Sequence, residues 1–303
     1  MSLDADSIVD RRRLKRRLMV WRALAVVAFA AVGIALVGDV DGLPGTDHVA
    51  RLYVSNVIVE DTHRQTALEE LRDDDSVRAL IVHIDSPGGS VVGGESLYRA
   101  IREVSEEKPV VVTMGTLATS AGYMVAIGGD HLIAHEGSVT GSIGVLLQSA
   151  NITGLLDKIG VKPEIIKSGP LKAQPNPLEV TTPEARQAIK DVILDMQEMF
   201  TTLVKERRKL TSDELKKVSD GRIFSGRQAL ELGLVDELGG EKQARAWLAE
   251  TRNVPESLDV RDVVIDYGEE KWRRLVNGYI GKTLFSKRLS LDGLVSLWQP
   301  VAW

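Results

Sequence analysis

Ser120 is the residue of this chain best suited by its surroundings to act as a nucleophile. It lies among small residues in the segment 114–124 (MGTLATSAGYM), directly after an apolar run that predicts a buried strand. Small neighbours leave room for a peptide backbone to approach a hydroxyl group. A serine at a predicted helix start also commonly caps that helix. The segment alone therefore leaves two interpretations open, a helix cap and a nucleophile.

A serine nucleophile needs a base, and the composition narrows the choice. The chain has no cysteine, and no obvious nucleophile adjoins any of its five histidines, which are His48, His63, His83, His131 and His135. His83 lies in an apolar strand pattern, which is typical of a core histidine. The base is therefore expected to be a lysine or a carboxylate.

Other kinds of site are disfavoured by the motifs. His131 and His135 are four residues apart, but their segment predicts strand and turn, and without an HExxH pattern no metal site is expected. The acidic run 73–75 is typical of a solvated turn. The glycine-rich stretch 88–94 has neither a P-loop nor a GxGxxG pattern, and no cofactor is expected. Its backbone N–H groups, between a strand and a helix, suit an oxyanion as well as a phosphate.

Charge is distributed unevenly along the 303 residues, whose formal net charge is -5. Residues 1–22 carry seven basic and three acidic side chains, a net of +4, which leaves -9 for the rest. An acidic body has no basic excess to neutralise phosphates, so no nucleic-acid partner is expected. The absence of cysteine excludes disulfides and thiolate zinc sites.

An apolar stretch follows the basic cluster and predicts a membrane anchor. Residues 18–38 are long enough to span a hydrocarbon core of ~30 Å as a helix. Basic residues before the span place segment 1–17 in the cytoplasm and the rest outside it. A cleaved signal peptide is the alternative, but no small-x-small cleavage site follows the apolar run. Residues 39–47 (DVDGLPGTD) predict a linker.

The body alternates strands and helices, which predicts βαβ units and a mostly parallel, covered sheet. Strands are expected over 48–59, 78–85, 109–114, 131–134 and 162–167. Helices are expected over 62–71, 94–105, 151–159, 183–208 and 241–250, with a short one near Ser120. Thr182 and Pro183 have the residue types of an N-cap and a first helical position. Residues 168–181 predict a proline-rich loop.

Four motifs in matching order make the chain resemble the signal peptide peptidase A family, membrane-bound serine proteases of the ClpP/crotonase superfamily. They are residues 85–90 (DSPGGS), 119–123 (TSAGY), 140–144 (TGSIG) and 167–172 (KSGPLK). The likeness covers residues 48–250 and the single anchor. It implies an α/β fold of stacked βαβ units with a helical C-terminal part. Residues 251–303 would be an extension that contacts partner subunits or membrane.

The resemblance also assigns roles to particular residues. Ser120 matches the nucleophile, and Lys172, rather than Lys167, matches the general base. The backbone N–H groups of Gly89 and Ala121 would form the oxyanion hole, and Ser142 would orient the base. The family often has glycine where this chain has Ala121, a change that leaves the donor N–H intact.

A lysine base must be neutral, whereas an unperturbed lysine with a pKa of ~10.4 is charged at neutral pH. Burial lowers a lysine pKa, and Pro170, Leu171 and the assembled body are expected to desolvate Lys172. Neutral Lys172 would take the Ser120 proton on attack and return it to the leaving amine, giving an acyl-enzyme that water hydrolyses.

The resemblance further implies partners and a location. The short, single-domain type would assemble into a ring or dome in which neighbouring subunits contribute Ser and Lys to one site. Peptide substrates would be remnant signal peptides and other apolar peptides, degraded on the outer side of a bacterial inner membrane. One alternative is a catalytically inactive oligomeric scaffold of the same fold. A crotonase-type acyl-CoA enzyme is another, but it fits poorly with a membrane export segment.

Overall fold

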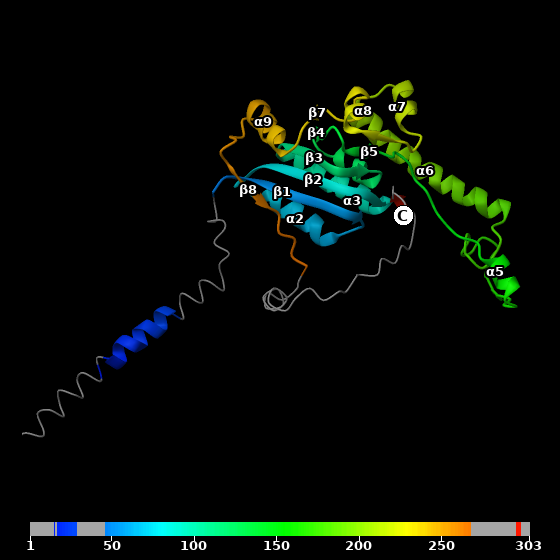
Figure 1. Ribbon diagram of the computed structural model, residues 1–303, viewed down its shortest axis with the longest axis horizontal. Coiled ribbons are helices and arrows are strands. Elements are labelled where there is room, and N and C mark those ends of the chain that lie inside the picture. The colour runs from blue at the N-terminus through cyan, green and yellow to red at the C-terminus, as the bar shows by residue number, and fades with distance from the viewer. Residues whose placement is uncertain (1–14, 16, 29–45, 268–294, 298–303) are drawn as a thin grey trace, which may run out of the picture. The chain divides into compact units, whose positions relative to one another are not determined.

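The computed structural model of the chain describes residues 15, 17–28, 46–267 and 295–297 (Figure 1). The chain divides into two compact units, Met1–Thr46 and Asp47–Trp303. In the first, residues 17–28 are helical and exposed. No helix within the described ranges is long and apolar enough to cross a membrane. Most of the predicted anchor's second half, residues 29–38, and linker residues 39–45 lie outside the described residues.

The second unit is built on one mixed sheet. Its central strands β1 (His48–Ile58), β2 (Val77–Ser90) and β3 (Val110–Thr119) run parallel to one another. The strand order along the sheet is β6-β5-β3-β2-β1-β8. The shorter strands are β4 (His131–Ala134), β5 (Val139–Gly141), β6 (Ile223–Ser225), β7 (Glu237–Leu238), β8 (Asp259–Asp262) and β9 (Val295–Leu297). Two pairs, β5 with β6 and β2 with β9, are antiparallel. The α/β prediction is confirmed, but the sheet is mixed, and it includes β8, beyond residue 250.

Helices cover both faces of the sheet, as continuous apolar strands require. Alternate residues of β2, such as Leu80 and Ile81, enter two separate clusters of buried side chains. One cluster includes residues of α2 (Thr62–Asp73), α3 (Val91–Glu107) and α4 (Ala121–Ala126). The other includes Ala244 and Leu248 of α9 (Glu241–Arg252). Figure 1 shows α2 and α3 on one side of the sheet and α9 on the other.

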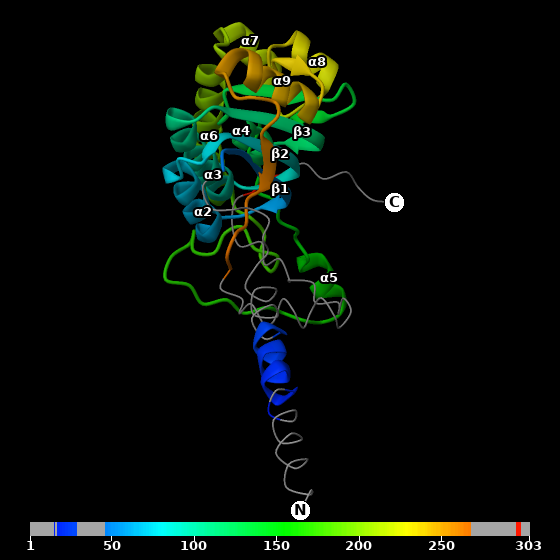
Figure 2. The ribbon, with the colours of Figure 1, turned by 90° about the vertical axis from the view of Figure 1, so that its left-hand side faces the viewer.

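An arm formed by residues 144–182 leaves the sheet and returns along a long helix, α6 (Pro183–Arg208) (Figures 1 and 2). It carries the short helix α5 (Thr153–Lys158). The predicted strand over residues 162–167 is wrong, because these residues pair with no other strand of the described chain. Branched residues such as Ile165 and Ile166 favour extended backbone, but a strand also needs a neighbour for its backbone hydrogen bonds.

The start of α6 is confirmed. Thr182 accepts a hydrogen bond from the Ala185 N–H at 3.1 Å, and Pro183 occupies the first turn. Two further helices, α7 (Ser212–Val218) and α8 (Gly226–Glu231), follow, and each begins with a capping box. Helix α7 contacts α6, and α8 contacts β5 and β6 at the edge of the sheet.

Candidate active site

Ser120 occupies a sharp turn where β3 passes into α4. Its φ and ψ are 57° and -120°, a conformation that strains any residue other than glycine. Its N–H donates to the Gly141 carbonyl at 2.8 Å, and its own carbonyl accepts from the Met124 N–H at 2.9 Å. Its side chain makes no capping hydrogen bond to α4. The helix-cap interpretation therefore does not account for this serine.

The C-terminal end of β2 lies against the start of α4. The Thr119 hydroxyl donates to the Pro87 carbonyl at 3.0 Å. A Cβ built on Gly94 would lie 3.0 Å from Ala121 Cβ, and one built on Gly122 would lie 3.1 Å from Ser86 O. These contacts place the glycine-rich stretch beside the turn that carries Ser120.

Gly89 is required at its position for steric reasons. A Cβ there would lie 1.8 Å from the carbonyl oxygen of Ile58, the last residue of β1. Ser86 fixes the same stretch, because its hydroxyl donates to Asn56 O at 2.5 Å and accepts from the Gly88 N–H at 3.1 Å. The sequence interpretation did not single out Ser86, although it lies within the DSPGGS motif.

The pairing of β2 with β3 ends at Ser86, and after it β2 pairs with β9. Residues 295–297 pair antiparallel with Gly88–Ser90, and Gly89 stands opposite Ser296. On the other side, Gly89 pairs with Ile58 of β1. The backbone of β2 beside Ser120 therefore accepts an extended chain as an added strand.

Ser142 is brought into the neighbourhood of Ser120. It follows Gly141, whose carbonyl receives the Ser120 N–H. Its φ is 51°, and its own N–H donates to Arg222 O at 2.8 Å. Ser142 also borders an open hollow of about 370 Å³, which is lined in part by Gln197 of α6. Ser120 donates to Gly141 O, and Ser142 follows Gly141, so two serines with positive φ lie at this one hydrogen bond. Backbone strain of this kind clusters at functional sites.

Lys172 lies elsewhere, in an exposed loop of the arm. Leu171 is half exposed and Pro170 is exposed. In the single chain these two residues therefore leave the Lys172 loop exposed, and desolvation within an assembly stays a prediction. The structure therefore brings Ser120, Ala121, Gly89 and Ser142 together, whereas Lys172 lies in the exposed loop of the arm.

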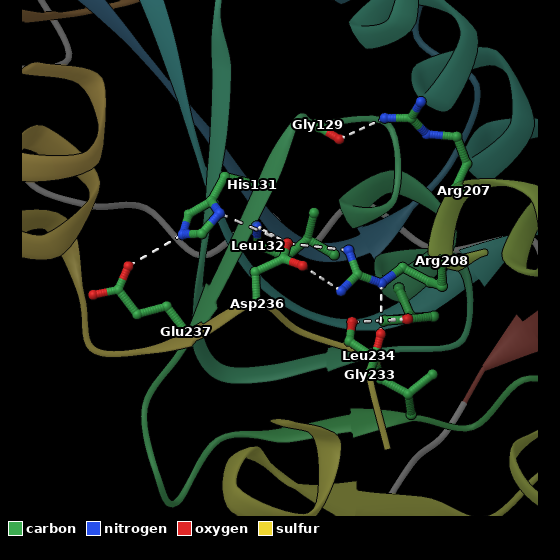
Figure 3. A network of polar contacts seen from close by, with 10 residues as sticks. Gly129, His131, Leu132, Arg207, Arg208, Gly233, Leu234, Asp236 and Glu237 are labelled. Atoms are coloured by element: carbon green, nitrogen blue, oxygen red, sulfur yellow. Dashed lines mark hydrogen bonds and ion pairs between the residues drawn. The ribbon is translucent and has the colours of Figure 1, made fainter. Parts of the chain in front are cut away.

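A network of arginines anchors the other end of α4 (Figure 3). Arg207 donates to Ile127 O and Gly129 O, both at 2.8 Å, where α4 ends. Arg208 donates to Gly233 O at 2.8 Å and pairs with Asp236 at 2.6 Å. Since both arginines end α6, they join the helix that borders the arm to the helix that begins beside Ser120.

Electrostatics in this network favour the charged pair. Burial raises the pKa of the Asp236 carboxyl, but the hydrogen bond and charge of Arg208, with the Leu132 N–H and the His131 ring, together hold that pKa below its usual range. Tyr123, fully buried in α4, donates to Leu234 O at 2.9 Å, and burial raises the pKa of its hydroxyl. Sequence reasoning missed these positioning residues, although Tyr123 lies within the TSAGY motif.

His131 has ordinary structural contacts. Its Nε2 lies 3.1 Å from Glu237 Oε2, and its ring stacks on Trp247 with the ring centroids 4.8 Å apart. His83 Nδ1 lies 3.0 Å from the Thr113 hydroxyl in the sheet. Both contacts are those of histidines that link elements of the fold.

The fold and this turn define a class, an α/β ClpP-like hydrolase with a strained serine at a strand-to-helix turn. Comparison with known proteins agrees. Residues 102–255 match the sequence profile of peptidase family S49, and residues 53–136 match that of the Clp protease family. The chain belongs to peptidase family S49 and is a serine protease.

Three relatives illustrate the family. A protein of Synechocystis sp. assigned as a protease is 40% identical over 203 residues, which cover 66% of this chain and 73% of that protein. One from Methanocaldococcus jannaschii, also assigned as a protease, is 31% identical over 94% of this chain and 99% of its own length. A protein of Enterococcus faecium assigned as a signal peptide peptidase is 28% identical over 76% of this chain and 64% of its own length.

Proposed function

We propose that the chain is a membrane-anchored endopeptidase that degrades remnant signal peptides and other apolar peptides, with Ser120 as nucleophile and Lys172 as general base. The observation that carries the proposal is the strained Ser120 turn beside a stretch of β2 that accepts an added antiparallel strand. A peptide bound there as a strand gains main-chain hydrogen bonds whatever its sequence. The relative assigned as a signal peptide peptidase supports the substrate class.

The proposed reaction follows the order of acyl transfer. Neutral Lys172 takes the proton from Ser120 Oγ as that oxygen attacks the scissile carbonyl carbon. The N–H groups of Gly89 and Ala121 stabilise the oxyanion. Lys172 then gives its proton to the leaving amine, and the acyl-enzyme forms. Water then attacks the ester carbonyl carbon while Lys172 takes its proton; Lys172 returns that proton to Ser120 Oγ as the ester bond breaks and the acid product leaves. Ser142 orients the Lys172 amine during both steps.

An assembled ring accounts for the exposed Lys172. The arm exposes several large apolar side chains, and soluble monomers rarely expose many of these together. They include Leu155, Ile159, Ile166, Leu171 and Val180. A second copy of the chain would cover this surface and bury the Lys172 amine, which lowers a lysine pKa. In such a ring the arm of one subunit delivers Lys172 to Ser120 of its neighbour.

The N-terminal unit supports anchoring. Helical residues 17–28 expose apolar side chains such as Met19, Trp21 and Val26. Together with residues 29–38 they would make one span, with the catalytic body outside the inner membrane. Resistance of the full chain to alkaline extraction from membranes, and its loss when residues 1–45 are deleted, tests this part.

Hydrolysis of an apolar peptide by single variants tests the dyad. Ser120→Ala and Lys172→Ala should each lose activity, whereas Lys162→Ala, which removes another exposed lysine of the arm, should keep it. Full activity in Ser120→Ala or Lys172→Ala would remove the dyad. Failure of the wild-type chain to react with an acylating inhibitor would favour the inactive scaffold instead.

Mixing variants tests the shared site. Oligomers assembled from both Ser120→Ala and Lys172→Ala chains should regain activity, because some interfaces then pair an intact serine with an intact lysine. Mixed oligomers that stay inactive would place both residues of a site in one subunit.

A further inference from the structure

The Lys172 loop is closed at its base by one carboxylate. Glu179 accepts hydrogen bonds from Lys167 Nζ at 2.6 Å, Gln174 Nε2 at 3.1 Å and Asn176 Nδ2 at 2.6 Å. Lys167 and Glu179 stand on either side of Lys172 in the chain, so their ion pair ties the two ends of the loop together. Three side-chain donors therefore converge on one carboxylate at the base of the loop.

Turns fix the backbone around Lys172 itself. The Lys172 N–H donates to Gly169 O at 3.2 Å, and the Gln174 N–H donates to Leu171 O at 3.3 Å. Between them Ala173 has a φ of 59°, which an alanine adopts only when its surroundings hold it there. Asn176 Nδ2 donates to the Ala173 carbonyl at 2.8 Å as well as to Glu179. A chain of contacts therefore runs from Glu179 through Asn176 to the residue that follows Lys172.

The ion pair is partly protected from water. The side chains of Lys167 and Glu179 are 12% and 26% exposed, which screens their attraction less than that of a surface pair. The hydrogen bonds from Lys167 and then Asn176 lower the pKa of the Glu179 carboxyl. Glu179 is therefore ionised at neutral pH and accepts all three donors at once.

We infer that Lys167 and Glu179 are positioning residues, which hold the loop in the one shape that presents the Lys172 amine to Ser120. The inference rests on the proposed function, since it takes Lys172 as the base. It gives the first lysine of the KSGPLK motif a role distinct from the second. Positioning matters because displacement of a reacting group by about 1 Å costs on the order of 100-fold in rate.

Glu179→Gln is the main test, in full-length chain purified in detergent. One oxygen becomes an NH₂ group that faces other donors, so the three contacts no longer form together. We expect kcat for an apolar peptide to fall about 10- to 100-fold, while KM stays within about twofold, because the loop holds the base rather than the peptide. Glu164→Gln, at an exposed glutamate of the same arm, should leave both constants unchanged.

Lys167 provides a conservative rescue. Lys167→Met should lower kcat as much as Glu179→Gln does. Lys167→Arg keeps a charged donor for Glu179, so its kcat should be at least about a third of the wild-type value. A thermal melt of each variant identifies any that fails to fold. If Lys167→Met does not fold, the kcat of Lys167→Arg alone is the test: retained activity supports the inference, and a loss as large as that of Glu179→Gln would overturn it. Equal losses in Lys167→Arg and Lys167→Met would overturn the inference.

A double variant separates this inference from the proposed function. The rate of covalent labelling of Ser120 by a fluorophosphonate is compared in Lys172→Ala and in Lys172→Ala combined with Glu179→Gln. Equal rates support positioning through Lys172, and a further loss in the double variant would overturn it. Wild-type kcat in Glu179→Gln beside an inactive Lys172→Ala would overturn the inference alone. Full activity in Lys172→Ala would instead overturn the proposed function.

Discussion

Replacement of Gly89 by alanine is a sharp perturbation of the proposed oxyanion hole. The Cβ would lie 1.8 Å from Ile58 O, about 1.5 Å short of the ~3.3 Å at which carbon and oxygen ordinarily meet. Both sides of the clash are backbone, so no side-chain rotation relieves it. Either the end of β1 or the Gly88–Ser90 stretch must move, and the Gly89 N–H moves with it.

The displacement sets the expected loss. Misplacing a group by about 1 Å costs on the order of 100-fold, and removing one oxyanion donor costs about 100- to 1,000-fold. We therefore expect kcat/KM for peptide hydrolysis to fall at least about 100-fold in Gly89→Ala. Overpacking of this kind destabilises a fold by about 1–3 kcal/mol, so the variant should remain folded at 25 °C.

Gly137→Ala is the matched control, because nothing lies within 4 Å of a Cβ built there. It should keep wild-type activity and melting temperature. The comparison needs initial rates of peptide cleavage and a thermal melt for each protein. A Gly89→Ala chain with more than half of the wild-type kcat/KM would refute the placement of Gly89 at the reacting carbonyl.

Three further predictions concern the network that anchors α4. Arg208→Leu leaves Asp236 and Gly233 O without their main donor and should destabilise the fold by about 2–4 kcal/mol in urea denaturation; a loss below ~0.5 kcal/mol would contradict it. Because Arg208 lowers the Asp236 pKa, the pair's stabilisation is present above the usual pKa of 3.8 and lost as pH falls through the lower folded value. The stability difference between wild type and Asp236→Asn should thus be constant from pH 8 to 5 and shrink below about pH 4; a constant difference down to pH 2 would count against it. Tyr123→Phe leaves Leu234 O without its buried donor and should cost about 1–2 kcal/mol, and an unchanged melting temperature would contradict this.

Apolar runs predicted the elements that build the central sheet. The strand beginning at His48 and the helices α2, α3 and α6 were expected close to their observed bounds, whereas β2 runs on to Ser90, five residues beyond its expected end at Asp85. Strands β5, β6 and β7 have only two or three residues, too few for any periodic pattern to predict. The error at residues 162–167 has a physical cause, since branched residues favour extended backbone but cannot supply a neighbouring strand.

The site was predictable in type but not in geometry. Small residues and motif order indicated Ser120, whereas its φ of 57° and its bond to Gly141 depend on how β5 meets β3. Arg208 and Asp236 are 28 positions apart, and no spacing rule links them. Lys172 was selected by its motif alone. It is exposed in the single chain, so it needs the proposed assembly to bury its amine.

Mapping the residue that a covalent inhibitor modifies tests the central claim most directly. Full-length chain is inactivated with a fluorophosphonate, digested, and analysed by mass spectrometry, with Lys172→Ala treated in parallel. We predict one adduct, on Ser120, formed about 100-fold more slowly but still measurably in Lys172→Ala. An adduct on another serine, or labelling of Ser120 at the same rate without Lys172, would contradict the account.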